Sequence, residues 1–217
     1  MKQNIQKKIR VLIADDHAIV REGIKRVIEK YPDIQLVAEA ASGDEVLSQI
    51  KNIPIDILLL DISMPGPGFL NIMQNLQKDY PAIKVLVLSV HPEDHYALRA
   101  LKAGAKGYID KSHSMEELHT AIRQINEGHR YITPRLAEKM LLEHAANIDQ
   151  QLHDKLSERE FQILLLIGEG KTVTEIASIL SLSPKTVSTY RARILEKMKF
   201  RSNNELIRYT IENELIN

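Results

Sequence analysis

Residues Leu58–Gly68 read LLLDISMPGPG, and this stretch decides the fold of the first half of the chain. Three leucines lead to a single carboxylate, Asp61, and two Pro-Gly pairs then interrupt the segment. A short apolar run bounded by turn residues is typical of a strand that is covered on both faces, as in a parallel sheet. The sequence therefore predicts a buried strand at Ile55–Leu60 that delivers one acid to a loop.

The same arrangement recurs on both sides of this stretch, where aliphatic runs alternate with segments whose apolar residues follow helical spacing. The other expected strands are Arg10–Ala14, Ile34–Glu39, Ile83–Leu88 and Lys106–Ile109. The expected helices are Ala18–Tyr31, Gly43–Lys51, Phe69–Tyr80, Glu93–Ala103 and Ser114–Glu127. Because alternating strands and helices build a parallel sheet, we predict an α/β domain with a five-stranded parallel sheet.

Composition narrows the class of protein. The chain has 217 residues, of which 44% are hydrophobic, and this suits one or two domains with real cores. There is no apolar run of about 18 residues, so no membrane span is expected. The basic N-terminal residues are not followed by the apolar region of a signal peptide. The absence of cysteine excludes disulfides and thiolate metal sites, and it fits the reducing cytoplasm.

The strand pattern stops in the second half of the chain. Thr133 and Pro134 supply a cap and a first-turn proline for a helix at Pro134–His144, and the polar segment Ala145–Asp154 is an expected linker. Ser157 and Glu160 have the spacing of a capping box, which opens an all-helical segment. The expected parts are an α/β domain at 1–128, a linker with a helix at 129–153 and a small all-α domain at 154–217.

Ionisable and hydroxyl side chains stand where the predicted strands end. The carboxyl ends of parallel strands share one edge of the sheet, and functional residues collect there. A single loop acid is more often merely solvated, but three neighbouring carboxylates favour a hard cation such as Mg²⁺. A cation and a lysine together suit a phosphoryl group, which a carboxylate can accept as a nucleophile. The residues concerned are Asp15, Asp16, Asp61, Ser89 and Lys111.

Residues 9 to about 128 resemble the receiver domain of a two-component response regulator. The resemblance implies a flavodoxin-like, doubly wound sheet in which Asp61 accepts a phosphoryl group from a histidine kinase. It rests on Asp15-Asp16, Asp61, Met64-Pro65, Ser89, Tyr108 and Lys111, which match the family in order.

The resemblance also implies roles for the residues around Asp61. Lys111 would contact the phosphoryl oxygens, while Ser89 and Tyr108 would move inward as a switch. The implied ligands of Mg²⁺ are Asp15, Asp16, Asp61 and the backbone carbonyl of Ser63.

Two departures from the family pattern concern the loop residues. Members often have a glycine eight residues after the acid, whereas Gly68 is the seventh, so the loop is expected to be one residue short and stiffened by its prolines. Lys111 is followed by Ser112 instead of the frequent proline.

Two other classes of protein fit the sequence less well. A haloacid dehalogenase-like phosphatase needs a second Asp where Ser63 stands, and a dinucleotide site needs a G-x-G-x-x-G that the first βα turn lacks.

The net charge of the chain is zero, with 29 basic and 29 acidic residues, but one segment of the second half has an excess of basic residues. Between Lys171 and Arg201, seven Lys or Arg stand against two Glu. Thr174–Leu180 predicts a short helix, and Ser183-Pro184 predicts the start of a second that runs to about Lys197. A basic helix face is about as often only solvated, but a helix, a tight turn and a basic second helix suit the DNA major groove.

Residues 156–206 resemble the LuxR-type helix-turn-helix domain, through Leu156–Glu160, Gly170, Glu175–Ala177, Lys185–Val187 and Lys197-Met198 among others. The resemblance implies that hydroxyls and one methyl face the bases while the basic side chains contact phosphates. Such groups discriminate bases poorly, so a single domain should bind weakly and a functional homodimer is expected. The expected DNA-binding residues are Lys185, Thr186, Ser188, Thr189, Arg191, Ala192, Arg193 and Lys197.

Together the two resemblances have the order of the NarL/FixJ subfamily. They imply a cytoplasmic, phosphorylation-controlled transcription regulator that is not an enzyme, with a sensor histidine kinase and promoter DNA as partners. An alternative is a phosphorylation-independent DNA-binding regulator that uses its receiver for dimerisation; an aspartate-nucleophile phosphatase is a third possibility.

The histidines do not predict a zinc site, because His91 and His95 lack a third ligand. His91 is instead a candidate for controlling the lifetime of the phosphoryl group.

Overall fold

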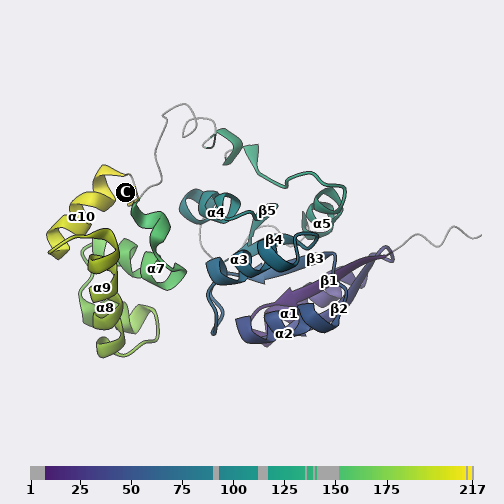
Figure 1. The fold of residues 1–217 in the computed structure, drawn as a ribbon, viewed down its shortest axis with the longest axis horizontal. Helices are drawn as coiled ribbons and strands as arrows, with labels where there is room; N and C mark the ends of the chain where they lie inside the picture. Colours follow the sequence, from purple (N-terminus) through teal and green to yellow (C-terminus); the bar gives the residue numbers. More distant parts are fainter. Residues whose placement is uncertain are drawn as a thin grey trace, which may run out of the picture. The chain divides into compact units, whose positions relative to one another are not determined.

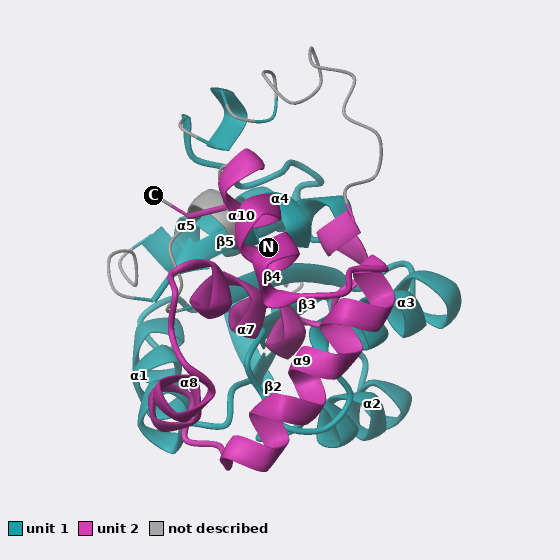
Figure 2. Cartoon of the chain, turned by 90° about the vertical axis from the view of Figure 1, so that its left-hand side faces the viewer, with its two compact units in different colours: residues 1–146 teal, residues 147–217 magenta. Residues whose placement is uncertain are grey.

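A computed structural model describes residues 8–89, 93–111, 117–134, 136–138, 140, 152–213 and 215–216, with the backbone alone for 93–95. The chain divides into two compact units, residues 1–146 and 147–217, which Figure 2 colours separately. The division falls inside the segment 129–153, where the sequence predicts a linker. The exact domain boundaries remain a prediction.

Unit 1 is built on a five-stranded parallel sheet in the order β2-β1-β3-β4-β5 (Figure 1). The strands are β1 Ile9–Ala14, β2 Ile34–Ala40, β3 Ile57–Asp61, β4 Lys84–Ser89 and β5 Gly107–Asp110. The helices between and after them are α1 Ala18–Ile28, α2 Gly43–Asn52, α3 Phe69–Asp79, α4 Glu93–Lys102 and α5 Leu118–Asn126. The predicted α/β fold is therefore confirmed.

The central strand shows why this sheet reads as nearly continuous apolar sequence. Every residue of β3 is buried, because helices cover both faces of the sheet. On one face the strands pack against α1 and α5 in a single apolar cluster that includes Ile24 and Ile122. The parallel register aligns the carboxyl ends of the strands, since Asp61 lies opposite Leu88 and Ser89 lies opposite Asp110.

Several boundaries differ from the predicted ones. Strand β3 begins two residues late, and the carboxylate of Asp56 just before it accepts hydrogen bonds of 2.7–2.9 Å from the backbone N–H and guanidinium of Arg10. Helix α1 ends at Ile28, because Pro32 disfavours helical backbone at the preceding residue, Tyr31.

Part of the connecting segment can also be compared with its prediction. Within the helix predicted at Pro134–His144, the described residues 134, 136–138 and 140 are helical. The remainder of that helix, the linker residues up to 151 and the predicted start of α5 at Ser114 lie outside the described residues.

Unit 2 contains helices and no strands among its described residues. Its elements are the 3₁₀ helix η2 Leu152–Lys155 and the helices α7 Glu158–Gly168, α8 Val173–Ile179, α9 Pro184–Met198 and α10 Asn203–Glu212. Ser157 and Glu160 form the predicted capping box at the start of α7. Helix α8 has a second capping box, from Thr172 and Glu175, that the sequence reading did not include.

The core of unit 2 is formed by the inner faces of these helices, with Phe161, Ile176, Ile194 and Leu206 all buried. No helix among the described residues is both long enough and apolar enough to cross a membrane.

Candidate functional site

An acidic cluster lies at the carboxyl edge of the sheet. Asp15 follows β1 and Asp61 ends β3, and the two strands are paired neighbours. Asp15 is fully buried and Asp61 is 3% exposed, whereas Asp16 and His17 are exposed. The donor atoms of these four residues lie within 4.8 Å of one another. The sheet therefore brings together the three acids that the sequence placed at strand ends.

Lys111 joins this cluster from the end of β5. Its Nζ atom lies 2.6 Å from Oδ2 of Asp15 and 3.0 Å from Oδ1 of Asp61. The lysine side chain is only 8% exposed. One buried ammonium thus bridges two buried carboxylates, which offsets part of the cost of removing their charges from water.

The second oxygen of Asp61 differs from the first. Oδ2 is buried and accepts no hydrogen bond from any residue that the structure describes. Burial raises the pKa of Asp61 above its usual value, and the ammonium of Lys111 offsets this only in part. A buried carboxylate oxygen without a hydrogen-bond donor is costly unless a ligand completes its environment.

His17 is a member of the cluster that was not predicted from the sequence. Its backbone N–H donates to Oδ1 of Asp15 at 2.8 Å, and its ring Nδ1 lies 2.9 Å from Oδ1 of Asp16. The available signal was its position directly after two aspartates, since an aspartate often binds the backbone N–H two residues on. The turn places the imidazole beside the acids.

The other predicted site residues lie around this cluster. Ser89 is fully buried at the end of β4, and its carbonyl accepts a 2.7 Å hydrogen bond from the backbone N–H of Lys111. Tyr108 is buried in β5 at 1% exposure. Ser63 is exposed in the turn after β3. Ser112 and His91 lie outside the described residues, as do the side chain of His95 and any zinc site based on it.

The loop after Asp61 packs against the start of α2. The carbonyl of Pro65 accepts a 2.9 Å hydrogen bond from the N–H of Gly43. Gly66 has φ +93°, and a Cβ atom there would lie 2.9 Å from Oδ2 of Asp44. The short loop is therefore held by a positive-φ glycine, and it reaches α3 directly because Gly68 is the N-cap of that helix.

The chemistry of the donor set indicates what the cluster can bind. Three carboxylates and one imidazole converge, and a hard divalent cation with oxygen ligands suits such a set. Asp61 contributes one carboxylate oxygen to this group, and its Oδ2 has no hydrogen-bond partner among the described residues. The residues therefore fit a divalent cation, with Lys111 beside it as a second positive group.

In unit 2, helices α8 and α9 form a helix-turn-helix. Ser181 adopts φ +53°, and the N–H of Leu182 donates to the carbonyl of Ala177 at 2.8 Å, which closes a tight turn. Ser183 then caps α9 by accepting from the N–H of Thr186, and Pro184 occupies the first helical turn. These are the start signals that the sequence predicted for the second helix.

Helix α9 has a buried inner face and an exposed outer face. Val187, Ile194 and Met198 are buried, at the spacing of one helix face. The guanidinium of Arg193 lies 5.9 Å from the ring centre of Tyr190, and the hydroxyl of Thr189 donates to the carbonyl of Lys185 at 3.0 Å. The exposed residues of the expected DNA-binding set are Lys185, Ser188, Thr189, Ala192, Arg193 and Lys197, while Thr186 and Arg191 are half-buried.

Lys197 differs from the other basic residues of α9. Its Nζ atom lies 2.6 Å from Oε2 of Glu160, whose side chain is 3% exposed. The ammonium is therefore engaged by the start of α7.

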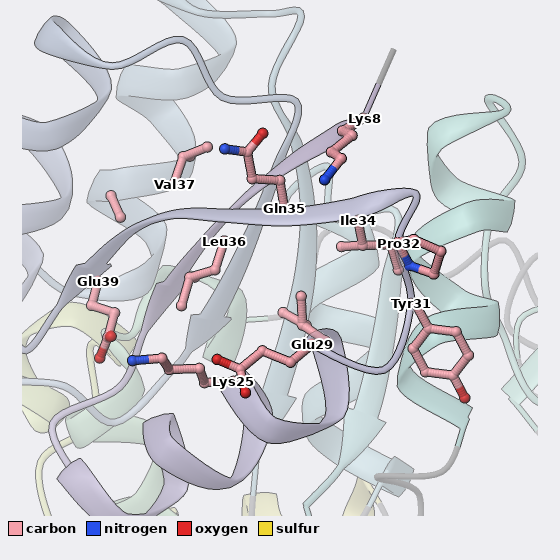
Figure 3. A pocket seen from close by; sticks show the side chains of 12 residues that line it. Lys8, Lys25, Glu29, Tyr31, Pro32, Ile34, Gln35, Leu36, Val37 and Glu39 are labelled. Carbon is pink, nitrogen blue, oxygen red and sulfur yellow. The ribbon is translucent and has the colours of Figure 1, made fainter. Parts of the chain in front are cut away.

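A separate hollow of about 540 Å³ lies along the edge strand β2 and the end of α1 (Figure 3). Its lining mixes charged residues such as Lys25 and Glu39 with apolar residues such as Ile34 and Leu36. None of the acidic cluster lines it.

Comparison with known proteins agrees with both halves of the chain. Residues 11–123 match the response regulator receiver domain, and residues 154–210 match the luxR family of bacterial regulatory proteins. The chain is 40% identical over 212 residues to the response regulator GacA of Pseudomonas aeruginosa, covering 96% of this chain and 98% of GacA. It is 37% identical over 213 residues to the response regulator UvrY of Escherichia coli, covering 96% of each.

Solved structures show the same architecture. The RcsB response regulator of Salmonella typhimurium matches with a TM-score of 0.61 and 25% identity, over 94% of this chain and 96% of that one. A LuxR-family response regulator from Aurantimonas matches with a TM-score of 0.58 and 35% identity, over 64% of this chain and 99% of that one. With a receiver domain followed by a LuxR-type domain along almost its whole length, the chain belongs to the NarL/FixJ family of two-component response regulators.

Proposed function

We propose that Asp61 is the phosphoryl acceptor through which a sensor histidine kinase controls DNA binding by this transcription regulator. One observation carries the assignment: among three clustered carboxylates, Asp61 has a buried oxygen without a hydrogen-bond donor among the described residues. Its other oxygen is held by Lys111 at 3.0 Å. One oxygen is thus fixed by a positive charge, while no hydrogen bond from the described residues competes for the other.

The reaction is a transfer of a phosphoryl group between two nucleophiles. Oδ2 of Asp61 forms a bond to phosphorus as the bond from phosphorus to the kinase histidine breaks, and the histidine nitrogen leaves with the electron pair. Attack by water later releases inorganic phosphate and restores the carboxylate. The regulator thus accepts and loses a phosphoryl group and transforms no other substrate.

The residues that would hold the metal are Asp15, Asp16, Asp61 and the backbone carbonyl of Ser63. When bound, Mg²⁺ would supply positive charge that offsets the charge developing on the phosphoryl oxygens. The ammonium of Lys111 lies 3.0 Å from Oδ1 of Asp61, so it would add positive charge close to a phosphoryl group on the same carboxylate. The donor set supports a divalent cation, and the preference for Mg²⁺ is part of the proposal.

The switch is proposed to involve Lys111, Ser89 and Tyr108. A phosphoryl group on Asp61 would present new anionic oxygens to the ammonium of Lys111 and to the hydroxyl of Ser89. Because Ser89 and Lys111 are already linked through their backbones, β4 and β5 would respond together. Tyr108 in the same strand would then change its packing and alter the surface of the receiver.

DNA binding is proposed for the outer face of α9. The exposed side chains there include two cations, Lys185 and Arg193, with small polar groups between them. A solved structure described as two RcsB dimers bound to two parallel DNAs supports a dimer on duplex DNA as the active form. Acting on DNA and receiving phosphoryl groups from a kinase fits a place in the cytoplasm.

Treatment with acetyl phosphate and Mg²⁺ tests the acceptor. Wild-type protein should run more slowly on a gel that retards phosphoproteins and should bind more tightly to a duplex selected from a random-sequence pool. Asp61→Asn should show neither change, whereas Asp79→Asn, at an exposed position on α3, should behave as wild type.

Two outcomes would contradict the proposal. If Asp61→Asn is still phosphorylated, another residue is the acceptor. If wild-type and Asp61→Asn proteins bind DNA equally before and after treatment, the phosphorylation-independent alternative holds.

A further inference from the structure

The ion pair between Lys197 and Glu160 joins the proposed DNA-binding helix α9 to helix α7. Lys197 stands in the last turns of α9, and Glu160 stands in the first turn of α7. The 2.6 Å contact is made to Oε2, the same oxygen that accepts a 2.7 Å hydrogen bond from the backbone N–H of Ser157. A single carboxylate oxygen thus holds both the capping box of α7 and the far end of α9.

The burial of Glu160 makes this contact hard to exchange. The carboxylate side chain is 3% exposed while the Lys197 side chain is 41% exposed. Burial by itself raises the pKa of Glu160, but the hydrogen bonds from Lys197 and Ser157 outweigh it, so the pKa lies below its usual value. If the ammonium moved to a DNA phosphate, an ionised carboxylate would be left buried without its cation, which is strongly unfavourable.

Two other basic residues of α9, Lys185 and Arg193, have no such ion pair among the described residues. Lys185 is exposed in the first turn of α9, and Arg193 is exposed against the ring of Tyr190. Neither has a carboxylate within ion-pair distance among the described residues. Lys185 and Arg193 are therefore exposed without an ion pair among the described residues, whereas Lys197 is paired within the protein itself.

We propose that Lys197 is a positioning residue, which sets the angle of α9 for the DNA groove by pairing with Glu160, and does not contact a phosphate. The inference rests on the proposed DNA-binding function of α9. It departs from the role that resemblance alone assigns to Lys197. The distinction has a measurable consequence, because each phosphate contact releases counterions and steepens the salt dependence of binding.

The test uses the full chain and a fluorescent duplex about 30 base pairs long, which is selected from a random-sequence pool and is long enough for two half-sites one helical turn apart. Affinity is measured between about 50 mM and 200 mM salt for wild type, Lys197→Met and Glu160→Gln. Lys185→Gln is the comparator for a phosphate contact, and Lys51→Gln, at an exposed position on α2 in unit 1, is the control. Melting temperature is recorded for every variant.

Lys197→Met and Glu160→Gln should each weaken binding by about tenfold with the salt slope unchanged, and the double variant should be no weaker than either single one. Lys185→Gln should lower the magnitude of the slope by about one. Glu160→Gln retains an oxygen for the N–H of Ser157, so it decides the question even if Lys197→Met fails to fold.

Three results would overturn the inference. A shallower slope for Lys197→Met, together with unchanged or tighter binding by Glu160→Gln, would make Lys197 a phosphate contact. A lower melting temperature with full affinity in both variants would make the ion pair merely structural. A wild-type protein that binds no duplex would refute the DNA-binding function itself and the inference with it.

Discussion

Lys111 holds only one side of the Asp61 carboxylate: Nζ lies 3.0 Å from Oδ1, while Oδ2 accepts no hydrogen bond within the described chain. The ammonium also contacts Asp15, at 2.6 Å, so the positive charge of Lys111 stabilises the Asp61 carboxylate only in part. An incompletely compensated buried carboxylate destabilises the folded receiver. The unpaired oxygen on the proposed phosphoryl acceptor therefore has a cost in folding free energy.

Replacing Asp61 with Asn should stabilise the receiver at neutral pH in the absence of divalent cations. Because burial raises the pKa of Asp61, the unfolded chain loses this proton at a lower pH than the folded chain does. The free energy of unfolding of wild type should thus fall as pH rises from the usual carboxyl pKa through the raised folded value. Asp61→Asn should not show this fall in the free energy of unfolding, because the amide carries no titrating proton, while Asp15 still pairs with Lys111.

The expected gain is about 1 kcal/mol, or a few degrees in melting temperature, above that pH range and close to zero below it. Thermal unfolding with a chelator present, followed across acidic and neutral pH, measures it. A variant that is less stable than wild type at neutral pH would show that the carboxylate is fully compensated in the fold.

The fold was largely predictable because its signals are local. A β3 that is apolar up to Asp61, with turn residues after it, specifies a strand covered on both faces. The cap at Ser183 and the proline at the first helical position specify where α9 starts. The order of the strands was not available from periodicity, which describes each element by itself. Nor was the shift in register between Val11 and Leu12, since a bulge depends on the partner strand.

The site was predictable as far as it depends on strand ends. Asp15 and Asp61 meet because β1 and β3 are parallel neighbours, and Lys111 arrives from β5 in the same way. His17 was missed because its place depends on a hydrogen bond within the turn. The contact between Lys197 and Glu160 was missed because it joins two helices through side chains, which spacing along one helix cannot show.

Mg²⁺ should raise the melting temperature of wild type, since a ligand that binds only the folded state stabilises it by about 2.7 kcal/mol at a concentration one hundred times Kd. Asp16→Asn should remove most of this shift, because Asp16 would supply one of the metal's oxygen ligands. The side chain of Asp16 is 35% exposed, so its loss should leave the metal-free fold unchanged. Asp79→Asn serves as the control, and a full shift in Asp16→Asn would exclude Asp16 as a ligand.

Two glycines of the loop after Asp61 should respond oppositely to alanine. Gly66 has φ +93° and faces Oδ2 of Asp44, so Gly66→Ala should destabilise unit 1 by about 1–2 kcal/mol. Gly68 has φ −65° and nothing within 4 Å of an added Cβ, so Gly68→Ala should be neutral or slightly stabilising. Urea unfolding of both variants tests the pair; equal effects would mean that the backbone of Gly66 imposes no constraint.

Removing the cap of α9 should weaken unit 2 and its DNA binding together. The side chain of Ser183 accepts a 3.0 Å hydrogen bond from the N–H of Thr186, and loss of such a cap costs about 1 kcal/mol. Ser183→Ala should therefore lower the unfolding midpoint of unit 2 in urea. Fraying of the first turn should also misplace Lys185 and weaken binding to the selected duplex. Ser178→Ala, at an exposed position on α8, is the matched control and should stay within about 0.5 kcal/mol of wild type. Equal stability of the two serine variants would show that the proline at the first turn suffices to start α9.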